Sequence, residues 1–180
     1  MSAPPPPPPP VVPVASVDAA NETFASVSAA LTATITRAAS FSDAELHHGV
    51  NEEWSTVQSL RHCVLVLDLW LAKTIQGEAD PFHPMALLPH FMPRTLPGTS
   101  IDPDADPSFD EACQIFRDRL DRLASYVATL TNGELDRPVE AHAKTVGGAL
   151  SIVFDELKAH TYFMNRDLDV IEASRSGVAP

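Results

Sequence analysis

A carboxylate and an imidazole four residues apart are the side chains of this sequence best placed for metal chemistry. Glu156 and His160 lie in a segment of helix length, and residues four apart in a helix project from the same face. That face is otherwise apolar, so both ionisable groups need a partner inside the protein. His62, in a second segment rich in leucine and valine, is the candidate partner. The sequence therefore predicts a three-ligand metal site of His62, Glu156 and His160.

This ligand set matches a single catalytic ion. Di-iron bundles need four carboxylates and two Glu-x-x-His motifs, whereas this chain has one inward glutamate, at a spacing of four. Two histidines and one glutamate leave a coordination position open for water or substrate, and zinc or nickel is the expected divalent metal. A histidine on an apolar helix is by itself more often a core residue, so the interpretation of His62 depends on Glu156 and His160. Asp155 and Asp167 are the candidates for orienting the ligands.

Four long segments with helical periodicity must position these residues. The apolar spacing predicts helices over about 18–39, 55–76, 108–130 and 146–173. Capping boxes begin at Ser42, Ser55 and Ser108, and no segment has convincing strand character. The predicted fold class is therefore all-α, a four-helix bundle whose ligand site is built from inward side chains on facing helices.

A long Pro-rich crossover, residues 77–107, separates the second and third predicted helices. About 30 residues can run the length of a helix of about 20 residues, roughly 30 Å, so these two helices can lie parallel. Its apolar residues predict that it packs over one end of the bundle as a lid. His83 and His90 could supply a fourth ligand or touch substrate, although structural roles are expected. The acidic run 102–106 lacks the glycine and the terminal glutamate of a calcium loop.

Composition limits the partners and the location. A net charge of −12 argues against nucleic acid and anionic membranes, because both require a basic surface. No window reaches the roughly 18 apolar residues of a membrane span, and the N-terminus lacks a secretory signal, so a cytoplasmic location is expected. Cys63 and Cys113 fall on apolar stripes and are interpreted as small core residues in a reducing compartment.

The domain organisation follows from the N-terminal prolines. Residues 1–16 contain seven consecutive prolines and are predicted to form a disordered, proline-rich tail. Residues 17–175 form the predicted helical domain, because the chain is long enough for one buried core and short for two.

Several sequence motifs, taken together and in order along the chain, resemble those of a known protein family. NEEWSTVQSLRH, GEADPFHP, IDPDADPSFDEA, LTNGELDR and FDELKAHTYFMNRDLDVIE together resemble the DinB-like proteins of actinobacteria, in the superfamily of DinB and mycothiol-dependent enzymes. The resemblance covers about residues 20–173 and implies an up-down-down-up four-helix bundle. It places the family's metal ligands on His62, Glu156 and His160, although the superfamily more often has histidine at the position of Glu156.

The resemblance also implies a function. Similar characterised proteins use a low-molecular-weight thiol such as mycothiol, whose pKa the metal lowers so that a thiolate meets an electrophile. The implied activity is a metal-dependent thiol S-transferase or isomerase acting on a small-molecule electrophile, such as a maleyl-type acid, an epoxide or a xenobiotic. The alternative is a non-catalytic metal-binding bundle that acts as a stress-response or binding protein. In either case, the Ala-rich face of the first helix could pair with a second copy in a homodimer.

Overall fold

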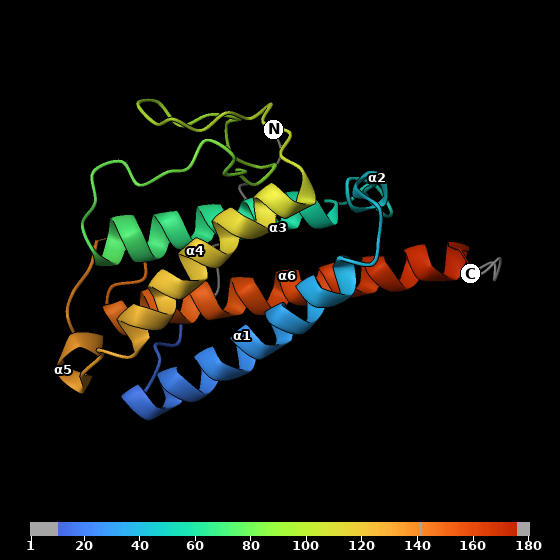
Figure 1. The fold of residues 1–180 in the computed structure, drawn as a ribbon. Coiled ribbons are helices and arrows are strands. Elements are labelled where there is room, and N and C mark those ends of the chain that lie inside the picture. The colour runs from blue at the N-terminus through green and yellow to red at the C-terminus, as the bar shows by residue number, and fades with distance from the viewer. Residues whose placement is uncertain (1–10, 141, 176–180) are drawn as a thin grey trace, which may run out of the picture.

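The computed structural model describes residues 11–140 and 142–175, and this part of the chain is all-helical (Figure 1). It contains no strand, and its one isolated β-bridge joins Pro138 and Thr145. None of its helices combines the length and the apolar character needed to cross a membrane. Residues 1–10 of the predicted tail lie outside the described residues, so the division into a tail (1–16) and a domain (17–175) stays a prediction.

The long helices lie close to where their periodicity predicts them. In chain order the elements are α1 (Val17–Ala38), α2 (Asp43–Leu46), α3 (Thr56–Val66), the π-helix η1 (Leu67–Ile75), α4 (Phe109–Val127), α5 (Asn132–Leu135) and α6 (Val146–Arg175). The three capping boxes are confirmed. In each, the serine hydroxyl accepts a hydrogen bond from the backbone amide of the residue three positions later. The side chain of that later residue accepts a hydrogen bond from the backbone amide of the serine. These caps fix where α2, α3 and α4 begin.

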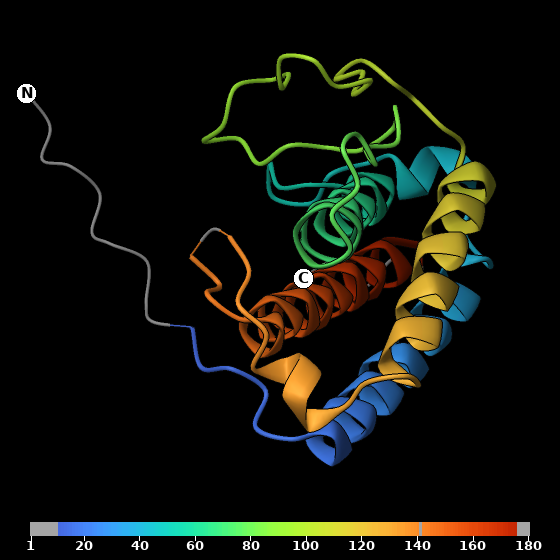
Figure 2. The same cartoon turned by 90° about the vertical axis from the view of Figure 1, so that its left-hand side faces the viewer.

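Helix α6 is the central element of the core. It packs against α1, α3 and η1, while α3 also packs against α4 (Figure 2). Its fully buried side chains include Phe154, Leu157, Met164 and Leu168. Because Glu156 lies on the same helix, the packing that closes the core also determines which residues face α3.

The second long helix changes its hydrogen-bonding pattern after Val66. The sequence predicts one continuous α-helix here, whereas residues Leu67–Ile75 form a π-helix. The amide of Gln76 donates to the carbonyl of Leu71, five residues earlier, at 3.0 Å, which is the wider ladder of a π-turn.

An ion pair with a buried carboxylate joins this π-helix to α4. Asp68 is 1% exposed, and its carboxylate accepts from Arg119 Nε of α4 at 2.8 Å and from the backbone amide of His83 at 2.9 Å. Burial raises the pKa of Asp68, although the His83 amide and the Arg119 guanidinium act in the opposite direction. The carboxylate thereby joins η1, α4 and the crossover.

The crossover lies along the outer side of α3 and η1 (Figure 1), and the expectation that it covers one end of the bundle is wrong. Two buried charged side chains explain its course. Arg61 Nε donates to the carbonyl of Met85 at 2.8 Å, and Asp68 accepts from His83. Since buried charged groups need hydrogen-bond partners, the loop backbone is held where it supplies them.

Both cysteines are buried and free, as their positions predict. Burial raises the pKa of the Cys63 thiol well above its ordinary value, and it raises the pKa of Cys113 to about 12. Neither side chain is therefore a nucleophilic thiolate near neutral pH.

The Asp68 pair predicts a large loss of stability on truncation. Asp68→Ala removes the acceptor of the His83 amide and the partner of the Arg119 guanidinium, whose side chain is 25% exposed. We expect a loss of about 2 kcal/mol in the free energy of unfolding, measured by urea denaturation. Asp104→Ala is the matched control, because the Asp104 and Arg94 side chains are 78% and 73% exposed. Its expected cost is below about 1 kcal/mol. Similar small losses in both variants would contradict this account of Asp68.

Candidate metal centre

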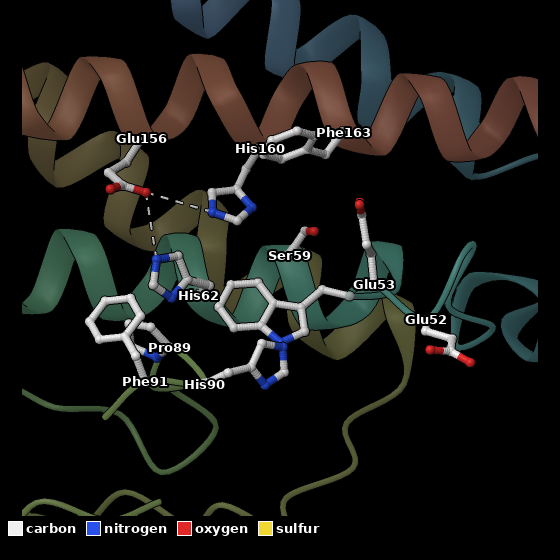
Figure 3. A pocket seen from close by; sticks show the side chains of 11 residues that line it. Glu52, Glu53, Ser59, His62, Pro89, His90, Phe91, Glu156, His160 and Phe163 are labelled. Carbon is white, nitrogen blue, oxygen red and sulfur yellow. Dashed lines mark ion pairs between the residues drawn. The ribbon is translucent and has the colours of Figure 1, made fainter. Parts of the chain in front are cut away.

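The structure brings the three predicted ligands together between α3 and α6. Glu156 Oε2 lies 3.6 Å from His62 Nε2 and 3.7 Å from His160 Nε2 (Figure 3). One ligand atom from each residue lies within 4.8 Å of the other two. Among the described residues, this is the only group of histidine, cysteine and acidic side chains close enough together to hold a metal ion.

These separations fit the ligands of one ion. Nitrogen and oxygen ligands of zinc lie about 2.0–2.2 Å from the metal, so two of them at a tetrahedral angle are about 3.4 Å apart. The two measured separations, 3.6 and 3.7 Å, are close to that value and longer than an ordinary hydrogen bond. All three ligand atoms lie within 4.8 Å of one another, so a divalent cation can bind between them once the two imidazoles approach each other.

A backbone carbonyl orients His62. Its Nδ1 lies 3.0 Å from the carbonyl oxygen of Leu87 in the crossover. A carbonyl can only accept, so Nδ1 donates its proton to Leu87, and Nε2 is the ring nitrogen that faces Glu156 and is available as a metal ligand. The prediction that Asp155 and Asp167 orient the ligands is wrong, because Asp155 is paired with Lys158 and Asp167 with Arg166.

His160, in contrast to His62, has no backbone carbonyl bonded to its Nδ1. It is 7% exposed, and its Nδ1 is buried with no hydrogen-bond partner. Burial, with a smaller effect of the neighbouring His62, lowers the pKa of His160 to about 4. The interaction with the His62 imidazole lowers the pKa of Glu156 and outweighs the effect of its burial. Near neutral pH, His160 is thus neutral and Glu156 ionised, and these are the forms that bind a cation.

His62, Glu156 and His160 form the candidate metal-binding triad. Trp54 packs against the two imidazoles of this triad, a role that the sequence did not reveal. The sequence places this residue only as an apolar neighbour of the cap at Ser55. In the structure its ring lies 4.8 Å from the ring of His62, 4.9 Å from that of His90 and 5.7 Å from that of His160, centroid to centroid. The indole therefore packs against both ligand imidazoles and against His90 of the crossover.

A tight turn before α3 holds Trp54 in this position. Asn51 and Glu52 both have positive φ angles, 57° and 62°, which residues other than glycine rarely adopt. Gly49 approaches this turn so closely that a Cβ added to it would lie 2.4 Å from the carbonyl oxygen of Glu53. Such backbone geometry persists only where the surrounding contacts enforce it, and strained turns of this kind often lie beside functional sites.

A cavity of about 470 Å³ opens over the triad. Trp54, Phe163 of α6, and Pro89 and Phe91 of the crossover form its apolar walls, and His90 also lines it. Of the two crossover histidines, His90 thus reaches the site. His83 has the expected structural role, since its Nδ1 accepts from the amide of Met85 at 3.2 Å.

Comparison with known proteins agrees with the resemblance found in the sequence. The family model for the DinB superfamily matches residues 26–164. The chain belongs to the DinB superfamily. The matched span includes His62, Glu156 and His160, so the site lies within the part of the chain that the superfamily shares. No curated protein and no solved structure matches this DinB-superfamily chain.

The low pKa of His160 predicts how stability depends on pH. In the unfolded chain the imidazole takes up a proton near its ordinary pKa of 6.5, whereas in the folded protein it stays neutral down to about pH 4. Between these values the unfolded state binds more protons, so the free energy of unfolding falls as the pH falls. We expect the metal-free protein to lose up to about 3 kcal/mol between pH 7 and 4 from this residue.

Urea denaturation at several pH values measures this effect. His160→Gln removes the titrating imidazole and should flatten the slope between pH 6.5 and 4. His48→Gln is the matched control, because His48 is exposed, and it should keep the slope of the unaltered protein. Equal slopes in both variants would contradict the burial argument.

Proposed function

We propose that this DinB-superfamily protein binds one divalent metal ion through His62, Glu156 and His160 and is a metal-dependent thiol S-transferase or isomerase. The cavity over the triad carries the proposal. Structural metal sites are closed by protein ligands, whereas catalytic sites keep one position open. Here three ligands face a cavity of about 470 Å³, and the Glu156 side chain is 42% exposed. The triad is thus open to a small molecule.

A low-molecular-weight thiol of the mycothiol type is the proposed co-substrate. A bound divalent cation would lower the pKa of a coordinated thiol and favour its thiolate. The chain has two cysteines, Cys63 and Cys113, and both are buried with raised thiol pKa values. The reacting sulfur must therefore come from outside the protein, and a small-molecule electrophile is its proposed partner.

The residues of the site have separable roles in this proposal. Leu87, through its carbonyl, keeps the His62 proton on Nδ1 and leaves Nε2 free to bind metal. Trp54 and Phe163 keep water from the ligand imidazoles, because their rings pack against the ring of His160. The remaining walls orient the electrophile beside the thiol.

We further propose that the four long helices follow the up-down-down-up order of DinB-like bundles. The match to the superfamily, the long crossover between η1 and α4 and the course of the ribbons in Figure 1 support this order. A cytoplasmic location and a homodimer through the Ala-rich face of α1 stay predictions.

Metal content is the first test. Elemental analysis of the full-length protein should find about one zinc or nickel ion per chain. His62→Ala and Glu156→Ala should each lower metal affinity at least about tenfold, because each removes one of three protein ligands. His48→Ala removes an exposed histidine outside the site and should leave the metal content unchanged. Absence of metal from the unaltered protein, after incubation with zinc, nickel or manganese, would end the proposal.

Turnover separates an enzyme from a non-catalytic metal-binding bundle. The metal-loaded protein, given mycothiol and a panel of electrophiles, should consume the thiol, and His62→Ala should reduce this rate at least about a hundredfold. If the protein binds metal, if His62→Ala lowers its melting temperature, and if no electrophile reacts, then the metal has a stabilising role and the catalytic part of the proposal fails.

A further inference from the structure

The cavity over the triad is bordered by negative charge. Its lining contains three carboxylates, Glu52, Glu53 and Glu156, and no described lysine or arginine lines it. Figure 3 shows Glu52 and Glu156 at opposite ends of the cavity. Glu156 belongs to the triad, so the other two carboxylates set the charge of the outer end. A ligand that reaches from the triad to the outer end therefore meets an acidic rim.

The cationic side chain beside this rim is already engaged. Arg166 Nη2 lies 2.6 Å from Glu53 Oε2 and 2.7 Å from Asp167 Oδ1. Its guanidinium carbon also lies 5.4 Å from the centre of the Phe163 ring. Two carboxylates share this one guanidinium, so the group leaves no positive charge uncompensated for a carboxylate ligand.

The walls between the two ends are aromatic. Phe91, on the crossover, is 88% exposed although it lines the cavity, and Phe163 is 38% exposed. Trp54 forms the wall nearest the triad. An apolar ligand would cover these faces and remove them from water, which favours its binding. Aromatic faces also attract cations more than anions, because their π-systems are negative above the ring.

We propose that the ligand of this cavity has an apolar, preferably aromatic, body with an uncharged or cationic outer end, and that Glu52 and Glu53 select against carboxylates there. The inference rests on the proposed function in taking the triad as the end that holds the thiol. It deepens that function by naming the substrate class. Among the electrophiles that the resemblance implies, an uncharged epoxide or an apolar xenobiotic fits the cavity, and a maleyl-type acid does not.

A matched series of thiols tests the selection. Phenylmethanethiols with an aminomethyl, a hydroxymethyl or a carboxymethyl group at the para position share the same thiol, ring and methylene, and differ in an outer group that is cationic, neutral or anionic. Their dissociation constants are measured by calorimetry at low ionic strength, on the metal-loaded protein and after treatment with a chelator. The amine should bind at least about tenfold more tightly than the carboxylate, with the alcohol between them.

Variants assign this order to the rim. Glu52→Gln and Glu53→Gln should each reduce the ratio between amine and carboxylate affinities. Glu22→Gln makes the same change of net charge on an exposed part of α1, outside the cavity lining, and should leave the ratio unchanged. Because Glu52 and Glu53 are exposed, 0.5 M salt, an ionic strength with a Debye length of roughly 4 Å, should also reduce the ratio.

Failure of this inference can be told apart from failure of the proposed function. If the carboxylate binds as tightly as the amine to a protein that takes up metal, the inference is wrong and the metal site stands. A ratio that stays the same in Glu52→Gln and Glu53→Gln would also overturn it. If the charge order holds in a protein that takes up no metal, the selection by the rim is established and the proposed function fails alone.

Discussion

The site depends on the packing of α3 against α6 around three polar side chains. His62 and His160 are nearly buried, and Glu156 faces both of them from the same apolar interface. Removing such groups from water is unfavourable unless they find partners, and here the partners are one another. Glu156 and His160, both on α6, cannot satisfy each other without a third group. The position of His62 on α3, fixed by the core packing, is what makes the three groups a site.

The crossover supplies hydrogen-bond partners and a cavity wall that the helices do not provide. Backbone groups from residues 83–87 bind Arg61, His62 and Asp68, so one loop satisfies three buried polar side chains of the second long helix. The same segment continues into Pro89, His90 and Phe91, which line the cavity. The loop therefore orients a metal ligand, holds the π-helix and forms one wall. Other backbone groups of the loop bond to each other, as the Asp102 amide does to the carbonyl of Pro84 at 2.8 Å.

The sequence predicted what depends on periodicity and spacing, and missed what depends on backbone geometry. The i, i+4 pair, the partner histidine and the three capping boxes were readable because helical faces repeat regularly. The carbonyl of Leu87 was not, since every residue has one. Trp54 reaches the imidazoles only because Asn51 and Glu52 adopt positive φ angles, and glutamate does not signal such a turn. The π-helix was equally invisible, because its apolar residues also suit an α-helix.

The central claim is that His62, Glu156 and His160 bind the same cation. A crystal structure of the full-length protein, isolated without chelators and with diffraction measured at the absorption edge of the bound metal, tests this most directly. The claim predicts one anomalous peak about 2 Å from the Nε2 atoms of His62 and His160 and within bonding distance of the Glu156 carboxylate. An empty position between these side chains in a protein shown to contain metal, with the peak at another place, would contradict it.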